Sequence, residues 1–134
     1  MKRSRLIVWG AGELGGRVAT AWARQAKAIG LTQTETRHAD LRAQGITPST
    51  ESAAAWLQPA DTLLLSMPGH QRQRTALEEI IAQPAPARAV LISSTGYYGA
   101  TVGPIDEQTP AGTSDRAQAI AATEQLFLQW AGDG

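Results

Sequence analysis

A glycine-rich turn that joins an apolar run to a helix-forming stretch constrains this chain more than any other feature. The apolar run Leu6-Ile-Val-Trp9 has the β-branched centre of a strand that is covered on both faces. The turn Gly10-Ala-Gly-Glu-Leu-Gly15 follows with the spacing G-x-G-x-x-G, and the stretch from Arg17 to Gln25 is rich in helix formers. Strand, glycine turn and helix in this order form the context in which the motif binds a dinucleotide.

Each glycine of the turn has a physical task in that setting. Gly10 permits a tight turn, Gly12 lets the backbone approach a pyrophosphate, and Gly15 lets the helix pack closely on the strand. Backbone N–H groups at the start of the helix then face the phosphates. We expect the side chain of Glu13 to point outward. We therefore predict a dinucleotide site rather than a plain structural turn, formed by Gly10, Ala11, Gly12, Glu13, Leu14 and Gly15.

The rest of the chain alternates apolar runs with helical stretches, which predicts a parallel sheet with right-handed crossovers. The expected strands span 6–9, 26–32, 46–47, 61–67 and 88–93. The expected helices span 17–25, 35–44, 51–58, 71–83 and a last stretch from Ser114 or Asp115 to about Trp130, with a long loop at 97–113. The predicted fold class is α/β, a doubly wound parallel sheet of Rossmann type with strand order 3-2-1-4-5. It forms a single domain over 1–134.

Apolar periodicity indicates which side chains of each helix lie together on one face. The first helix has an apolar face formed by Leu14, Val18, Ala21 and Trp22. In the helix at 71–83 the side chains expected to face inward are Leu77, Ile80 and Ile81. Core or interface positions are expected for Trp9, Trp22, Trp56 and Trp130.

The end of the second strand selects the cofactor, because an acidic residue there binds the ribose 2′-OH of NAD and a basic residue suits the 2′-phosphate of NADP. No acidic residue stands at Thr32 or Gln33. The hydroxyls of Thr32 and Thr34 and the guanidinium of Arg37 favour a 2′-phosphate. Glu35 would instead hold a 2′-OH, and a third alternative is that this stretch only begins the next helix. We predict NADP as the cofactor, with NAD as the alternative.

Composition excludes several classes of protein. The 134 residues include 12 basic and 12 acidic side chains, so the net charge of zero gives no reason to expect nucleic-acid binding. The absence of cysteine excludes disulfides and thiolate metal sites, and we expect no metal centre. No apolar run approaches the roughly 18 residues of a membrane span, and the N-terminus lacks the apolar core of a signal peptide. We expect a cytoplasmic protein that contacts neither nucleic acid nor membrane.

Motifs spread along the chain resemble those of one enzyme superfamily. They are Gly10-Ala-Gly-Glu-Leu-Gly15, Thr32-Gln-Thr34, Ser66-Met-Pro68, Ser93-Ser-Thr-Gly-Tyr-Tyr-Gly99 and Ile120-Ala-Ala-Thr-Glu-Gln-Leu-Phe127. With them the chain resembles the short-chain dehydrogenase/reductase superfamily, and within it the extended or atypical branch of NAD-dependent epimerases and dehydratases, which act mostly on nucleotide sugars. In typical members the first two glycines of the turn are three positions apart, whereas Gly10 and Gly12 are two positions apart. The resemblance extends the expected set of cofactor-binding residues, which then also includes Ser66, Met67, Pro68 and Ser93.

The resemblance also implies where catalytic residues would stand. In the family a serine or threonine after the fifth strand hydrogen-bonds the reacting oxygen of the substrate, and the matching residue is Ser94. A Tyr-x-x-x-Lys motif on the next helix supplies the general acid/base, but with Glu124 aligned those positions hold Arg116 and Ile120. The last helix contains no tyrosine and no lysine, so it cannot supply the pair. Tyr97 or Tyr98 would then be the other catalytic residue, and Tyr98 matches a family tyrosine that lies near the substrate. Ordinary packing of one ring and exposure of the other is the stronger expectation.

Extended members continue beyond this length into a small C-terminal substrate domain, so we expect the cofactor half without the substrate half. The leading hypothesis is a dinucleotide-binding domain with little or no turnover alone. The alternatives are an oxidoreductase with an unusual acid/base, acting on a nucleotide sugar or a carbonyl compound, and an interaction module that has lost cofactor binding. A homodimer or a partner chain is expected through 88–93 or the last helix, because an edge strand invites pairing. His70 lies at the ligand-binding edge of the sheet, although an exposed loop position is the stronger expectation.

Overall fold

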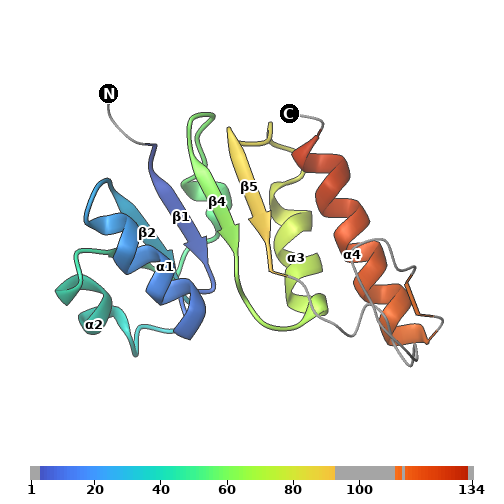
Figure 1. The fold of residues 1–134 in the computed structure, drawn as a ribbon, viewed down its shortest axis with the longest axis horizontal. Helices are drawn as coiled ribbons and strands as arrows, with labels where there is room; N and C mark the ends of the chain where they lie inside the picture. The colour runs from blue at the N-terminus through green and yellow to red at the C-terminus, as the bar shows by residue number, and fades with distance from the viewer. Residues whose placement is uncertain (1–3, 93–110, 113, 133–134) are drawn as a thin grey trace.

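The computed structural model describes residues 4–92, 111–112 and 114–132, without the side chain of Glu13. Within these residues five short strands form one sheet: β1 Leu6–Trp9, β2 Ala28–Leu31, β3 Thr47–Ser49, β4 Thr62–Leu65 and β5 Arg88–Leu91. Their order is β3-β2-β1-β4-β5, and every neighbouring pair is parallel. Figure 1 shows the arrows of β1, β4 and β5 pointing the same way. The predicted strand order 3-2-1-4-5 is confirmed.

Helices cover both faces of this sheet. One face carries α1 Glu13–Ala23 and α2 His38–Ala43, and the other carries the 3-10 turn η1 Ala53–Ala55, α3 His70–Ile80 and α4 Asp115–Ala131. In Figure 1 the first pair stands at the left and α3 and α4 at the right. The α/β doubly wound arrangement is therefore the observed one. Among the described residues, no helix is both long and apolar enough to cross a membrane.

The two helix layers enclose two separate cores, as expected for strands that are apolar on both faces. The core beneath α3 and α4 includes Ile7, Leu63, Leu77 and Phe127. The core beneath α1 and α2 includes Leu6, Val8, Ala19 and Leu41. Successive residues of a strand thus enter opposite cores, which holds the sheet between the layers.

Helix α1 packs only part of the apolar face that its periodicity indicates against the core. Ala19 is 0% exposed and packs on the sheet, whereas Leu14 is 51% exposed. Ala21 is also exposed. Val18 and Trp22 are half-buried and pack against the core, as expected. The helix lies too close to β1 for large side chains at its contact, so small residues make it. Periodicity alone does not reveal this approach, because it ranks residues by hydrophobicity and not by size.

The observed elements differ from their expected bounds by a few residues. Helix α1 begins at Glu13, because the end of the glycine turn is already helical. The stretch 51–58 forms only η1, where the Ser52 hydroxyl caps the backbone N–H of Ala54 at 3.2 Å. Strand β5 ends before Ser93, which lies outside the described residues. Ile81, expected to face inward, follows the end of α3 and is 39% exposed.

Helix α4 begins as predicted from its capping residues. The hydroxyl of Ser114 accepts a hydrogen bond from the backbone N–H of Ala117 at 3.1 Å. Asp115 follows in the first turn, where a carboxylate complements the helix dipole. The helix buries Ile120 and Phe127, and Phe127 belongs to the core that α4 shares with α3.

Strand β5 is an edge of the described sheet and is only partly covered. Val90 is 48% exposed and Ile92 is 38% exposed. Trp130 is half-buried, like Trp9, Trp22 and Trp56. Its indole Nε1 donates to the Gln83 carbonyl oxygen at 2.8 Å, which anchors α4 to the segment after α3. Association of a second chain with 88–93 or the last helix stays a prediction.

A buried ion pair ties together the amino ends of β1 and β4. Asp61 is 2% exposed. Arg5 donates to both of its carboxylate oxygens, from Nε to Oδ1 at 3.1 Å and from Nη2 to Oδ2 at 2.9 Å. The backbone N–H of Gln58 adds a third hydrogen bond to Oδ2 at 2.8 Å. Such a bidentate pair fixes the entry of β4 beside β1.

Replacing Asp61 by alanine is expected to lower the free energy of unfolding by about 3 kcal/mol, because a mostly buried guanidinium loses its counter-charge. Urea unfolding followed by circular dichroism measures the change. The matched control is Glu78→Ala, which removes an exposed partner 3.6 Å from Arg74 and is expected to cost less than about 0.5 kcal/mol. Equal losses in the two variants would contradict an anchoring role for Asp61.

Candidate functional site

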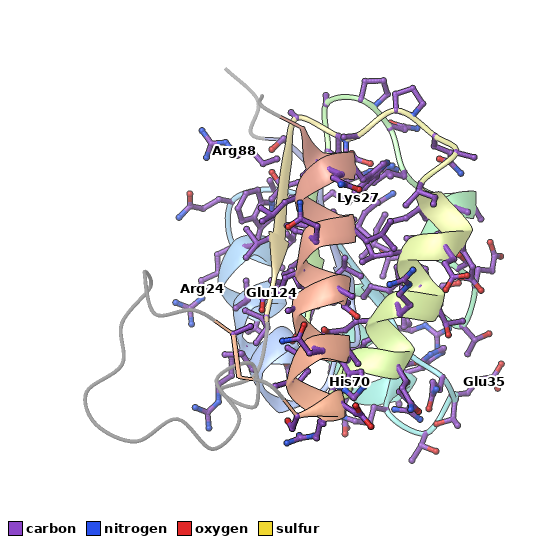
Figure 2. All side chains as sticks on the ribbon, turned by 90° about the vertical axis from the view of Figure 1, so that its right-hand side faces the viewer. Arg24, Lys27, Glu35, His70, Arg88 and Glu124 are labelled. Atoms are coloured by element: carbon purple, nitrogen blue, oxygen red, sulfur yellow. The ribbon has the colours of Figure 1, made fainter. Side chains whose placement is uncertain are left out.

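A cleft of about 1020 Å³ opens at the carboxyl ends of β1, β2 and β4. Its walls come from the glycine turn, the turn after β2, the loop after β3, the segment after β4 and the outer side of α3. Figure 2 shows Glu35 and His70 at this edge of the sheet, and Lys27 and Arg88 at the opposite edge. Open α/β sheets bind ligands at the carboxyl edge, where the strand order reverses. The cleft lies at that point, between β1 and β4.

Gly10 and Gly15 pack against neighbouring backbone without room for a side chain. Gly10 has a φ of +94°, and a Cβ added to it would stand 2.5 Å from the backbone nitrogen of Met67. A Cβ on Gly15 would stand 2.6 Å from the Gly10 carbonyl oxygen and 2.7 Å from Cγ1 of Val8. These two positions therefore have the tight turn and the close helix–strand contact that the fingerprint requires.

Gly12 has free space where a side chain would stand, whereas Gly10 and Gly15 have none. No heavy atom lies within 4 Å of a Cβ added to it, and it lines the cleft. It is also the N-cap residue of α1 and makes no side-chain capping hydrogen bond. The first N–H groups of a helix lack partners within the helix and carry its positive dipole end. The residues present therefore fit a dinucleotide, since the space beside Gly12 admits a pyrophosphate that a side chain would displace.

The end of β2 holds the glycine turn in place. The backbone N–H groups of Gly10 and Ala11 both donate to the Leu31 carbonyl oxygen, at 2.9 and 3.1 Å. These hydrogen bonds join the turn that follows β1 to the turn that follows β2. The two predicted cofactor segments consequently form one continuous wall of the cleft.

The turn after β2 is shaped by a histidine that sequence reasoning missed. His38 is buried, at 7% exposure, and its Nε2 lies 2.7 Å from the Thr32 hydroxyl oxygen. That hydroxyl donates to the Thr34 carbonyl oxygen at 2.5 Å. A hydroxyl has one hydrogen to give, so Nε2 of His38 is the donor in the first contact. Thr32 lines the cleft, but its hydroxyl hydrogen is used within the turn.

The guanidinium of Arg37 reaches from this turn to the start of α1. Its Nη1 donates to the Ala11 carbonyl oxygen at 3.3 Å, and Arg37 lines the cleft. Gln33 and Thr34 line it as well, whereas Glu35 does not. In Figure 2 the side chain of Glu35 projects outward at the margin of the molecule. The charge that this turn offers to the cleft is therefore positive.

The segment after β4 contributes Ser66, Met67 and Pro68 to the cleft. Gln73 of α3, 5% exposed, holds this segment from behind. Its side-chain Nε2 donates to the Met67 carbonyl oxygen at 3.1 Å and to the Ile92 carbonyl oxygen at 2.6 Å. Gln73 thus links the ends of β4 and β5, a role that no sequence motif indicated.

The far wall of the cleft was also absent from the sequence prediction. It combines the loop after β3 with the outer side of α3, where Ser52 donates to the Glu79 carboxylate at 2.9 Å. Nearer the glycine turn, Nη2 of Arg72 donates to the Gln33 side-chain oxygen. The predicted strand order could have indicated this wall, since the loops after β2, β3 and β4 must meet at the carboxyl edge of a parallel sheet.

The other expected site residues lie outside the cleft or outside the described residues. His70 is the first residue of α3, is half-buried and does not line the cleft. Ser93, Ser94 and Tyr98 fall outside the described residues. On α4, Ile120 is 2% exposed in the interior, and Arg116 is exposed. The described helix therefore presents no acid/base pair at the aligned positions.

The fold and its cleft define a Rossmann-like α/β domain with a glycine turn at the switch point of the sheet. No protein-family model and no curated protein matches the chain. The chain is similar to the solved structure of a functionally unknown conserved protein from Silicibacter pomeroyi DSS, with a TM-score of 0.70 and 26% sequence identity. The match covers 92% of this chain and 48% of that one, so the chain spans about half the length of that protein.

Replacing Gly10 by alanine is expected to lower the free energy of unfolding by about 2–4 kcal/mol, because the new Cβ meets backbone and the left-handed φ is unfavourable. Gly12→Ala is expected to cost about 1 kcal/mol or less, since its Cβ meets nothing within 4 Å. Thermal and urea unfolding of both variants test the difference. A Gly10→Ala protein as stable as Gly12→Ala would show that the turn is looser than described.

Proposed function

We propose that this chain is a dinucleotide-binding domain that prefers NADP, with the cofactor lying along the cleft at the carboxyl edge of the sheet. The observation that carries the proposal is the contrast among the three glycines. Gly10 and Gly15 are closed by contacts shorter than 3 Å to an added Cβ, and Gly12 has no atom within 4 Å. This combination of two closed positions and one open position is what the three tasks of the dinucleotide fingerprint demand.

The pyrophosphate would lie against Gly12 and the N-terminus of α1. The helix there has a glycine N-cap without a capping side chain, so its first N–H groups are available to an anion. Ser66 and Met67 line the cleft on the side of β4 and would bound the part of the cofactor beyond the pyrophosphate. A nicotinamide dinucleotide supplies hydride-transfer chemistry when bound. The described residues bind and orient it.

The preference for NADP follows from the charge at the end of β2. Arg37 lines the cleft and Glu35 does not, so the cation and not the carboxylate is available to the adenosine ribose. A carboxylate would select the 2′-OH of NAD, and a guanidinium suits a 2′-phosphate. The alternative cofactor NAD consequently has less support.

The proposed domain binds the cofactor with little or no turnover alone. The helix that would carry the acid/base pair in the epimerase/dehydratase family has a buried isoleucine and an exposed arginine there. Membership of that family, a cytoplasmic location and association with a second chain are parts of the same proposal.

Isothermal calorimetry is expected to show that the wild-type chain binds NADPH and that Gly12→Trp weakens this binding more than about 100-fold, or about 2.7 kcal/mol. The indole would fill the space of the pyrophosphate. The control is Ala21→Trp, which adds the same side chain to an exposed position of α1 that does not line the cleft. It should bind NADPH as wild type does. A wild-type chain that binds neither NADPH nor NADH would overturn the proposal.

A further inference from the structure

A second guanidinium reaches the end of β2 from the opposite side of the sheet. Arg72 is exposed in the first turn of α3 and lines the cleft. Its Nη2 donates to the side-chain oxygen of Gln33, a contact between residues 39 positions apart. The helix after β4 is thereby joined to the turn after β2, across the cleft.

The two arginines approach the same turn from the two helix layers. Arg37 extends over the start of α1, where Nη1 contacts the Ala11 carbonyl oxygen at 3.3 Å. Arg72 comes from α3, which packs on the other face of the sheet. Gln33, which Arg72 contacts, and Thr34 belong to the turn that ends at Arg37, and all four of these side chains line one cleft. An anion at the end of β2 would therefore have a guanidinium group available from each helix layer.

The charge of Arg72 is not cancelled where it is held. Its partner in the described contact is a neutral amide, so Gln33 positions the guanidinium without neutralising it. The neighbouring Arg74 differs, because its Nε lies 3.6 Å from the Glu78 carboxylate on the same helix. Arg72 can accordingly offer its full charge to a ligand, and Arg74 provides a natural comparison.

Glu79, an acidic residue of the cleft, is separated from Arg72 along α3 and has its own partner. Glu79 stands about two helical turns beyond Arg72 on α3, a rise of about 10 Å, and its carboxylate accepts from Ser52. Glu51 belongs to the loop after β3, which begins beside the end of β2, because the Thr32 N–H donates to the Ser49 carbonyl oxygen at 2.9 Å. The cleft is thus lined by the guanidinium groups of Arg37 and Arg72 and by the carboxylates of Glu51 and Glu79.

We propose that Arg72 is a specificity-determining residue, which binds the 2′-phosphate of NADP opposite Arg37 and so completes a two-sided clamp. The inference rests on the proposed dinucleotide function and adds the residue that separates NADP from NAD. A phosphate offers several acceptor oxygens to planar guanidinium forks, so two arginines can bind it from different directions. NAD has only a hydroxyl at this position and gains neither contact. Gln33 acts as a positioning residue for Arg72.

The test compares Arg72→Gln with the control Arg74→Gln by calorimetry against NADPH and NADH. Arg72→Gln should weaken NADPH binding about 10- to 100-fold, since it removes a hydrogen bond to a charged group, and change NADH binding less than about threefold. Arg74→Gln should change both less than about twofold. Arg72→Lys should recover part of the loss, because it restores the charge without the fork. Melting temperatures verify that each variant is folded.

A pair of smaller probes isolates the phosphate itself. Adenosine 2′,5′-bisphosphate and adenosine 5′-monophosphate differ only in the 2′-phosphate. Arg72→Gln should weaken the first about as much as it weakens NADPH and leave the second unchanged. The difference between the two should shrink at high salt, because exposed charges are screened.

The outcomes separate this inference from the proposed function. If wild type binds NADPH and Arg72→Gln weakens NADPH and NADH equally, Arg72 only shapes the turn, and the clamp is overturned while dinucleotide binding stands. The clamp is likewise overturned if Arg72→Gln changes nothing, or if wild type prefers NADH. If wild type binds neither nucleotide, both the proposed function and the clamp fail.

Discussion

The close approach of α1 to β1 is the contact on which the rest of the site depends. It requires a turn with positive φ at Gly10 and no side chain at Gly15, where an added Cβ would meet backbone and Val8 at less than 3 Å. Ala19 continues the contact one turn later with 0% exposure. With the helix so close, its N-terminus points into the cleft and leaves Gly12 facing open space. A larger residue at either closed position would move the helix and change the cleft.

The second constraint is that the loops after parallel strands meet at one edge. The Leu31 carbonyl oxygen holds the glycine turn, and Gln73 holds the segments after β4 and β5. At the opposite edge Arg5 and Asp61 fix the entries of β1 and β4. The cleft is therefore a consequence of how the sheet is held at both ends. Its lining residues come from four segments that are distant in the chain and adjacent in space.

Sequence reasoning worked where a local pattern has a direct structural meaning. The alternation of apolar runs and helical stretches predicted the strand order, and the glycine spacing predicted which residues form the turn. It failed where size or long-range contact decides. The face of α1 was partly misread, because apolar Leu14 is exposed whereas the small residues Gly15 and Ala19 make the closest contact with the sheet. Gln73 and His38 were missed because their partners lie in other segments. Ser94 and Tyr98 lie outside the described residues, so their predicted roles are untested.

By itself the sequence determined the fold class and the position of the glycine turn, since these depend on periodicity and on the unique freedom of glycine, which are local properties. It also determined that the last helix has no tyrosine and no lysine. Only the tertiary structure decided which charges share the cleft. Arg37 faces it and Glu35 does not, and Arg72 reaches it from α3 through Gln33. The physical reason is that a parallel sheet joins segments dozens of residues apart at one edge, and the direction of each side chain there depends on packing that no local pattern encodes.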